Sequence, residues 1–124
     1  MIKVLVVEDN LLNQKLTRTI LKVNGFEVEV ADSAEDALRL LDTLRPDIIL
    51  TDIQMPGIDG VQFAKIVKAR TDLAGIPVVA LTAYAMRGDR EHFLAQGLDG
   101  YISKPIDAQT FPEVVRGYAT RKSP

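Results

Sequence analysis

Five short runs with the character of β-strands, each followed by a stretch with helical periodicity, constrain the fold of this chain more than any other feature. The runs cover residues 2–7, 26–31, 47–51, 78–81 and 100–103. Such runs are typical of strands in a parallel sheet, and the stretches between them are long enough for crossover helices. Right-handed crossovers then place helices on both faces of the sheet. We therefore expect an α/β fold, a three-layer doubly wound sandwich of the flavodoxin-like kind with strand order 2-1-3-4-5.

The helical stretches carry apolar stripes that predict which helix faces are buried. The stripes are Leu12, Leu16, Ile20 and Val23 in the first stretch, Phe63, Ala64, Ile66 and Val67 in the third, and Val114, Val115 and Tyr118 in the last. A fourth helix is expected at about 86–96, with Gly88 near its first turn. Glycine inside a helix costs up to about 1 kcal/mol relative to alanine, so this helix is expected to be among the least stable elements.

Length and composition limit the classes of protein to which the chain can belong. Its 124 residues suit one domain, and we expect a single domain over 1–124 with no output domain. The absence of cysteine excludes disulfides, thiolate catalysis and zinc–thiolate sites. A net charge of -2 without a basic run argues against direct DNA binding, and no segment has the pattern of a membrane span or a signal peptide. We therefore expect a soluble cytoplasmic protein with no membrane partner.

Residues suited to phosphoryl chemistry follow four of the five runs. Glu8 and Asp9 follow the first run and Asp52 follows the third. Thr82 follows the fourth run and Lys104 follows the fifth. The carboxyl ends of parallel strands share one edge of a sheet, and strands one and three are neighbours in the expected order. The three acids should therefore converge beside the threonine and the lysine.

Three adjacent carboxylates repel one another, which favours a divalent cation among them. Oxygen ligands without histidine or cysteine favour Mg²⁺. Asp9 and Asp52 are the expected direct ligands. Glu8 is expected to act through water, and the backbone carbonyl of Gln54 is expected to complete the protein's share. With its charge offset by the metal, Asp52 can attack an electrophilic phosphorus and form an aspartyl phosphate.

Two further residues at the strand ends suit the same reaction. Lys104 offers a compact positive charge to one phosphoryl oxygen, and the Thr82 hydroxyl offers a hydrogen bond to another. No residue in the sequence suits an efficient base for hydrolysis, so the phosphorylated product should persist. We therefore expect a phosphoacceptor signalling protein, not an enzyme, which promotes only its own phosphotransfer and a slow self-dephosphorylation.

Each of these residues also has an ordinary structural interpretation when it is considered alone. Asp52 could simply end a strand in water, and the pair Glu8 and Asp9 could favour a helix N-terminus. Thr82 could cap a helix, and Lys104 could be a solvated surface lysine. The functional interpretation depends on their coincidence at four strand ends in one topology.

Four motifs together resemble the receiver domain of bacterial two-component response regulators. They are Val7-Glu8-Asp9-Asn10, the D-x-x-M-P-x-x-D-G pattern that begins at Asp52, Leu81-Thr82-Ala83 and Ser103-Lys104-Pro105. The resemblance extends from Ile2 to about residue 120; the chain is similar to single-domain regulators of the CheY type and more similar to those of the DivK type. The chain departs from many members in having glutamate at residue 8, where aspartate is usual. The longer side chain favours a metal contact through water.

The resemblance implies that a sensor histidine kinase or a histidine phosphotransfer protein phosphorylates Asp52 in a reaction that requires Mg²⁺. It implies a switch in which Thr82 and Tyr101 move together and alter the surface of the fourth helix, fifth strand and fifth helix, where downstream protein targets would bind. It also implies a cis peptide bond between Lys104 and Pro105.

By the same resemblance, the phosphoryl donor would meet the first helix around Asn13, Gln14 and Thr17. The protein would be a monomer that could dimerise on phosphorylation. The sequence leaves open whether such a receiver acts as a diffusible adaptor, a phosphate sink or a relay intermediate.

Three other functions compete with this interpretation. A phosphatase of the haloacid dehalogenase kind also uses a strand-end aspartate and Mg²⁺, but it needs a second acid two residues later, where this chain has Gln54. A flavin-binding module needs a loop rich in hydroxyl groups and glycine after the first strand, where Glu8 and Asp9 would repel the flavin phosphate. A receiver that binds partners without phosphorylation would not need all five site residues, although their retention does not exclude it.

Overall fold

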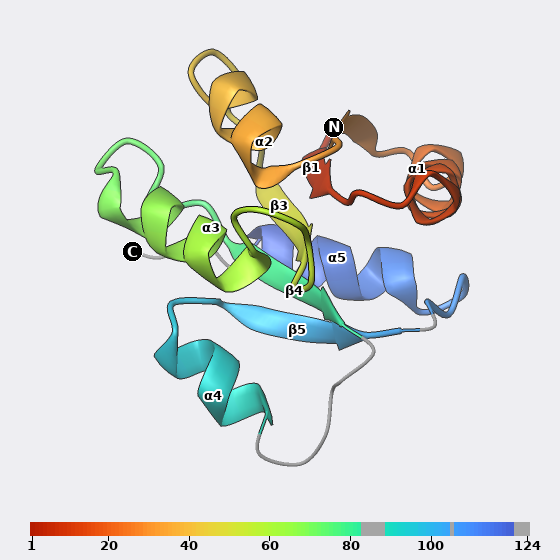
Figure 1. Ribbon diagram of the computed structural model, residues 1–124. Coiled ribbons are helices and arrows are strands. Elements are labelled where there is room, and N and C mark those ends of the chain that lie inside the picture. Colours follow the sequence, from red (N-terminus) through yellow and green to blue (C-terminus); the bar gives the residue numbers. More distant parts are fainter. Residues whose placement is uncertain (83–88, 105, 121–124) are drawn as a thin grey trace.

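The computed structural model describes residues 1–82, 89–104 and 106–120, with the backbone alone for residues 89 and 90. In this part of the chain, five parallel strands alternate with five helices (Figure 1). The elements are β1 Lys3–Val7, α1 Leu11–Val23, β2 Glu27–Ala31, α2 Ala34–Leu40, β3 Ile48–Asp52, α3 Gly60–Ala69, β4 Val78–Thr82, α4 Asp89–Ala95, β5 Gly100–Ser103 and α5 Phe111–Thr120. The sheet order is β2-β1-β3-β4-β5, which confirms the flavodoxin-like topology expected from the sequence.

Alternate residues of the strands face opposite sides of the sheet and build one apolar core on each side. In β1, Leu5 and Val7 belong to one buried cluster, whereas Val4 and Val6 belong to the other. All four side chains are fully buried. A strand buried on both faces has a continuous apolar sequence, and this is why the central strands could be predicted without tertiary information.

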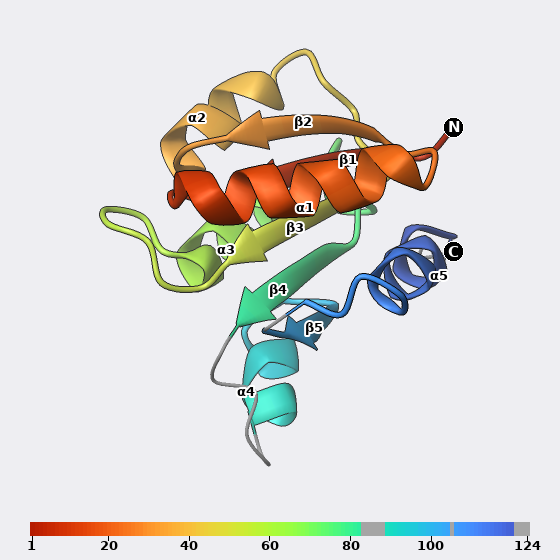
Figure 2. The ribbon, with the colours of Figure 1, turned by 90° about the vertical axis from the view of Figure 1, so that its right-hand side faces the viewer.

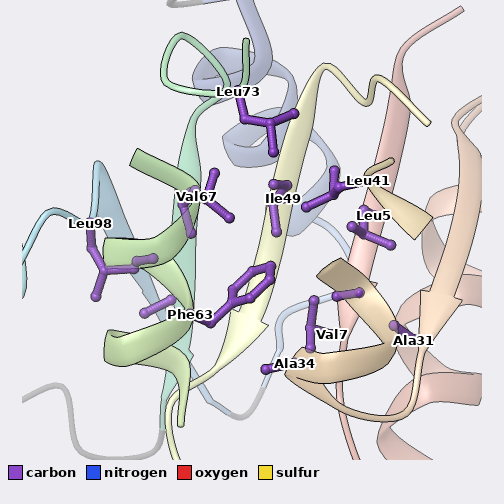
Figure 3. Packing of buried hydrophobic residues seen from close by; sticks show 14 of the residues in the cluster. Leu5, Val7, Ala31, Ala34, Leu41, Ile49, Phe63, Val67, Leu73 and Leu98 are labelled. Atoms are coloured by element: carbon purple, nitrogen blue, oxygen red, sulfur yellow. The ribbon is translucent and has the colours of Figure 1, made fainter. Parts of the chain in front are cut away.

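Helices cover both faces of the sheet (Figure 2). Leu21 of α1 and Phe111 of α5 belong to the cluster on one face. Residues of α2, α3 and α4 belong to the cluster on the other face. Figure 3 shows Phe63 and Val67 of α3 packed beside Ile49 of β3 in this second cluster. The core therefore consists of two apolar layers, one between each face of the sheet and its helices. The polar residues that follow the strands lie outside these layers.

The buried face of α1 differs from the sequence prediction. Thr17 and Leu21 face the core, whereas Leu12, Leu16 and Val23 are 74%, 48% and 80% exposed. The helical period identifies an apolar stripe on a helix, but it does not say whether that stripe faces the core or solvent. The prediction was therefore wrong for these three residues but right for Ile20, which is partly buried and packs against the core, and α1 presents an apolar stripe to solvent.

Smaller corrections apply to two other helices. Ile66 of α3 and Val114 of α5 are 37% and 40% exposed, although both were expected to face the core. Each lies at the edge of its helix's apolar stripe, where burial depends on how the helix is rotated against the sheet. The expected start of the fourth helix at 86, Gly88 and the expected cis bond before Pro105 lie outside the described residues.

No described helix is suited to cross a membrane. None of them combines the length and the apolar composition that a membrane-spanning helix requires.

Candidate functional site

The register of the sheet brings the carboxyl ends of four strands to one edge. Glu8 follows the last paired residue of β1 and is level with Asp52 at the end of β3. Thr82 ends β4, and its carbonyl accepts the backbone N–H of Lys104 at 2.9 Å. The predicted convergence of these residues therefore follows from parallel pairing, without any unusual local conformation.

Lys104 bridges two of the acids. Its Nζ lies 3.1 Å from Oε1 of Glu8 and 3.4 Å from Oδ2 of Asp52. Glu8 is 1% exposed, and the side chains of Asp52 and Lys104 are 16% and 20% exposed. The second carboxylate oxygen of Glu8 accepts the backbone N–H of Asn10 at 3.3 Å. Charges in such a partly dry setting interact more strongly than they would in water.

The surroundings of Glu8 affect its protonation. Burial raises the pKa of Glu8 above its usual value of 4.5, and the hydrogen bond and negative charge of Asp52 raise it further. The positive charge and hydrogen bond of Lys104 lower this pKa and so oppose the rise. Burial is the larger cause of the rise, and the neighbouring Asp52 carboxylate acts in the direction that the sequence predicted.

Asp9 completes an acidic group that suits a metal ion. Glu8, Asp9 and Asp52 each offer a carboxylate oxygen, and the three oxygens lie within 4.8 Å of one another. Asp9 is exposed and Asp52 is partly exposed, so both are open to an ion from solvent. A set of oxygen ligands with this charge fits Mg²⁺ better than softer metals.

Of the remaining predicted residues, Gln54 contacts Asp52, whereas Thr82 and Tyr101 lie on the two strands beyond β3. Gln54 is exposed, and its backbone N–H donates to Oδ1 of Asp52 over 3.4 Å. Thr82 is 2% exposed at the end of the neighbouring strand. Tyr101 is paired with Ala80 in the sheet, and both belong to the core cluster on the α3 side. Side chains alternate along β4, so Thr82 points to the same side of the sheet as Ala80 and Tyr101.

The loop between β3 and α3 is held against the end of β3. Asp59 and Gln62 form a capping box at the start of α3. A side chain at Gly60 would lie 2.3 Å from the carbonyl oxygen of Asp52, so only glycine allows this approach. Gly57, with φ of 78°, makes the turn that precedes the cap.

An open depression lies on the surface of the loop that follows Asp52. It is lined by Ile53, Gln54, Met55, Pro56 and Asp59, and its volume is about 600 Å³. The Asp52 side chain does not line this depression, but it is itself 16% exposed, so a reactant can approach its carboxylate from solvent.

Two features of the site were not predicted from the sequence. The first is the complete burial of Glu8, for which the sequence indicated only a metal contact through water. The second is its ion pair with Lys104, which joins residues 96 positions apart. Charged residues at strand ends indicated proximity, but no sequence signal indicates which pair of side chains makes direct contact.

Comparison with known families identifies the family of this chain. The profile of the response regulator receiver domain matches residues 4–116. The polar-differentiation response regulators DivK of Brucella anthropi and Brucella ovis are each 43% identical to the chain over 115 residues. These alignments cover 93% of the chain and 94% of each relative.

Solved structures share the fold. The chemotaxis protein CheY4 of Vibrio cholerae superposes with a TM-score of 0.89 at 28% identity, covering 95% of this chain and 98% of that one. The receiver domain of a sensor histidine kinase from Pseudomonas aeruginosa superposes with a TM-score of 0.85 at 31% identity, covering 94% and 96%, and was solved with magnesium coordinated in its active-site cleft. By its sequence, its sheet topology and the residues gathered at the strand ends, this chain belongs to the response regulator receiver domain family.

Proposed function

We propose that the protein is a response regulator that accepts a phosphoryl group on Asp52 and passes the signal to a downstream protein. The observation that supports this most strongly is the direct approach of Lys104 to both Asp52 and Glu8 at the edge of the sheet. A carboxylate nucleophile, a lysine and a metal-binding acidic group are the parts that phosphoryl transfer needs. The proposed setting is the cytoplasm, with the protein as a monomer before phosphorylation.

The proposed reaction is a displacement at phosphorus. An oxygen of Asp52 attacks the phosphorus of a phosphohistidine, a P–O bond forms and the P–N bond breaks. The electron pair of that bond stays on the histidine ring, which takes a proton from water. Mg²⁺, held by Asp9 and Asp52 with Glu8 through water and the Gln54 carbonyl, would offset the negative charge of the reacting oxygens.

Lys104 and Thr82 are the proposed partners of the transferred group. Nζ of Lys104 already lies 3.4 Å from Oδ2 of Asp52, so its ammonium group can form an ion pair with an oxygen of a phosphoryl group bound to Asp52. Thr82 lies at the end of the adjacent strand and can donate its hydroxyl to another oxygen. The carboxylates beside Asp52, those of Glu8 and Asp9, are assigned to the metal and not to activating water, so we expect self-dephosphorylation to be slow.

The N-terminal part of the exposed stripe of α1, without Val23, is the proposed surface for the phosphoryl donor. Leu11 and Leu12 are each 74% exposed, and Leu16 is 48% exposed. Lys15 and Arg18 are exposed on the same helix, which carries no acidic residue. This surface suits an apolar helical partner with acidic residues at its rim, as a histidine phosphotransfer protein or a histidine kinase would provide. It replaces the expectation that Thr17, which is buried, would take part.

The surface around β5 is the proposed output face. The ring of Tyr101 is half-buried, with its centroid 6.3 Å from that of Phe93 of α4. Tyr101, Ile102, Ser103, Val114 and Tyr118 line a groove of about 350 Å³ between β5 and α5. If the Thr82 hydroxyl turns toward a phosphoryl group, it vacates space on the side of the sheet where the Tyr101 ring lies. A coupled movement of the two side chains would then change this groove.

One experiment tests the central proposal. The protein is incubated with Mg²⁺ and acetyl phosphate, and its intact mass is measured. We expect the mass of one added phosphoryl group, which is lost in Asp52→Asn and retained in Asp59→Asn. The second variant is a matched control because Asp59 lies in the same loop and asparagine also caps helices well. The absence of phosphorylation in the wild type, or its persistence in Asp52→Asn, would refute the proposal.

The same preparation separates the two main competing functions. A phosphatase would hydrolyse generic phosphomonoesters with many turnovers, whereas we expect essentially none because an amide at Gln54 cannot act as a general acid. A flavin-binding module would be coloured after purification. Glu8 and Asp9 lie where a flavin phosphate would need donors, so we expect a colourless protein.

A further inference from the structure

Gln14 makes two contacts at the edge of the acidic group that the proposed function does not use. It lies in the second turn of α1 and is half-buried. Its Nε2 donates to the backbone carbonyl of Glu8 at 2.5 Å and to Oδ1 of Asp32 at 2.7 Å. Both partners can only accept hydrogen bonds, so the amide nitrogen must be the atom that faces them. The side chain thereby joins α1 to the ends of β1 and β2.

The Glu8 carbonyl lies just beyond the last residue pair of β1 and β2. The N–H of Glu8 still pairs with the carbonyl of Ala31, the last residue of β2. Beyond Ala31 the chain turns away, because Ser33 caps α2 by accepting the N–H of Asp36. No strand residue follows to pair with the Glu8 carbonyl, and the Gln14 amide takes that place.

This carbonyl belongs to the peptide group that joins Glu8 to Asp9. A peptide group is planar, so fixing the direction of its carbonyl oxygen fixes the rotation about the bonds on either side of it. The rotation after Cα of Glu8 places the backbone of Asp9, and the rotation before Cα of Asp9 sets the direction of the Asp9 side chain beside that of Glu8. These residues supply two of the three carboxylates whose oxygens lie within 4.8 Å of one another.

We propose that Gln14 is a positioning residue for the metal and phosphoryl site, which it orients through the Glu8–Asp9 peptide group, and that Asp32 anchors the Gln14 amide. The inference rests on the proposed function, since it assigns a metal to the acidic group. Groups outside the ligand set that orient metal ligands commonly affect metal affinity by tenfold or more when they are removed. Gln14 acts through the backbone, so its effect should appear in metal binding and leave the chemistry of Asp52 unchanged.

The test measures Mg²⁺ affinity of the unphosphorylated protein by titration calorimetry, together with its thermal stability. Gln14→Met keeps the length of the side chain and removes the donor. Gln96→Met makes the same chemical change in the turn after α4, away from the strand ends that carry the site. We expect Mg²⁺ to bind about tenfold more weakly to Gln14→Met and unchanged to Gln96→Met. At saturating Mg²⁺, the rate of phosphorylation by acetyl phosphate should return to that of the wild type.

A second variant distinguishes an anchoring role of Asp32 from a direct effect of its negative charge on Mg²⁺ binding. Asp32→Ala removes the anchor and also a negative charge, either of which could weaken Mg²⁺ binding. If Asp32 acts through Gln14, Asp32→Ala will weaken binding in the wild type but have a clearly smaller effect in Gln14→Met, because the anchored group is already gone. Equal effects of Asp32→Ala in the two backgrounds would overturn the role assigned to Asp32.

The outcomes separate this inference from the proposed function. Unchanged Mg²⁺ affinity in Gln14→Met, with or without a loss of thermal stability, would overturn the positioning role while leaving the proposed function intact. A wild-type protein that neither binds Mg²⁺ nor accepts a phosphoryl group would refute both.

Discussion

Lys104 and Asp52 lie at the ends of non-adjacent strands, yet Nζ of one is 3.4 Å from Oδ2 of the other. The lysine reaches across the end of β4 and also contacts Glu8, so one positive charge serves two carboxylates. Removing one member of a partly buried group of charges leaves the others without compensation. The stability of the site and its response to phosphorylation should therefore be linked.

Replacing the lysine is expected to weaken the fold without abolishing it. In Lys104→Ala the Glu8 carboxylate loses its positive partner, which should lower the free energy of unfolding by about 1–3 kcal/mol. Urea denaturation at neutral pH without Mg²⁺ measures this loss. Lys65→Ala, at an exposed position of α3, is the matched control and should change stability little.

The same variant should separate phosphorylation from its structural consequence. Phosphorylated wild-type protein should show altered amide hydrogen exchange in α5 and β5, whereas phosphorylated Lys104→Ala should show much less change. The reason is that the lysine connects the charge at Asp52 to the segment after β5. A full exchange response in the variant would mean that the signal passes through other contacts.

The stability of the metal-free protein should depend on Glu8 in a defined pH window. The folded-state pKa of Glu8 lies above its unfolded value of 4.5, so the folded protein holds this proton more tightly. Stability therefore falls as pH rises from 4.5 through the folded-state pKa, and the full cost is present above it. Glu8→Gln lacks this titration, so its stability relative to the wild type should rise over that window.

Urea denaturation midpoints measured from pH 4 to pH 8 test this prediction. Glu29→Gln is the control because Glu29 is exposed on β2, and its stability should follow the wild type at every pH. A constant difference between Glu8→Gln and the wild type across the range would show that the glutamate does not titrate in this way. Added Mg²⁺ should stabilise the wild type more than Glu8→Gln at neutral pH.

A methyl group at residue 60 should disturb the phosphoacceptor directly. A Cβ there would lie 2.3 Å from the Asp52 carbonyl oxygen and 2.9 Å from Cα of Ile53. These are backbone atoms that cannot rotate away, so Gly60→Ala should cost about 1–3 kcal/mol of stability and slow phosphorylation by acetyl phosphate. Gly75→Ala is the matched control, because no heavy atom lies within 4 Å of its added methyl group. Equal behaviour of the two variants would contradict the close approach.

Changes on the exposed face of α1 should affect protein donors alone. Leu12→Ser removes apolar surface from the proposed donor site, so phosphotransfer from a histidine-phosphorylated protein that recognises the wild type should slow by about tenfold or more. Phosphorylation by acetyl phosphate should not change, because a small donor needs no docking surface. Val23→Ser makes a similar change at an 80% exposed position in the last turn of the same helix and should leave both reactions unaffected. Equal slowing by both variants would place the donor elsewhere.

Much of the fold follows from local patterns in the sequence. The apolar runs of β1, β3 and β4 are buried on both faces and needed no partner to be recognised. The start of α3 is encoded by Asp59 and Gln62, which contact each other within one turn. Because parallel strands share one polarity, the same reasoning located Glu8, Asp52 and Lys104 at a common edge.

The sequence by itself therefore determined the strands, their order and the set of residues at the strand ends. Only the tertiary structure decided that Glu8 is buried against Lys104, that Leu12 faces solvent while Thr17 faces the core, and that Gln14 takes the place of a missing strand partner. The physical reason is that periodicity and turn preferences act over a few residues of chain. Helix rotation, side-chain pairing and burial depend on contacts between segments that are far apart in the sequence, and these exist only after the layers have packed.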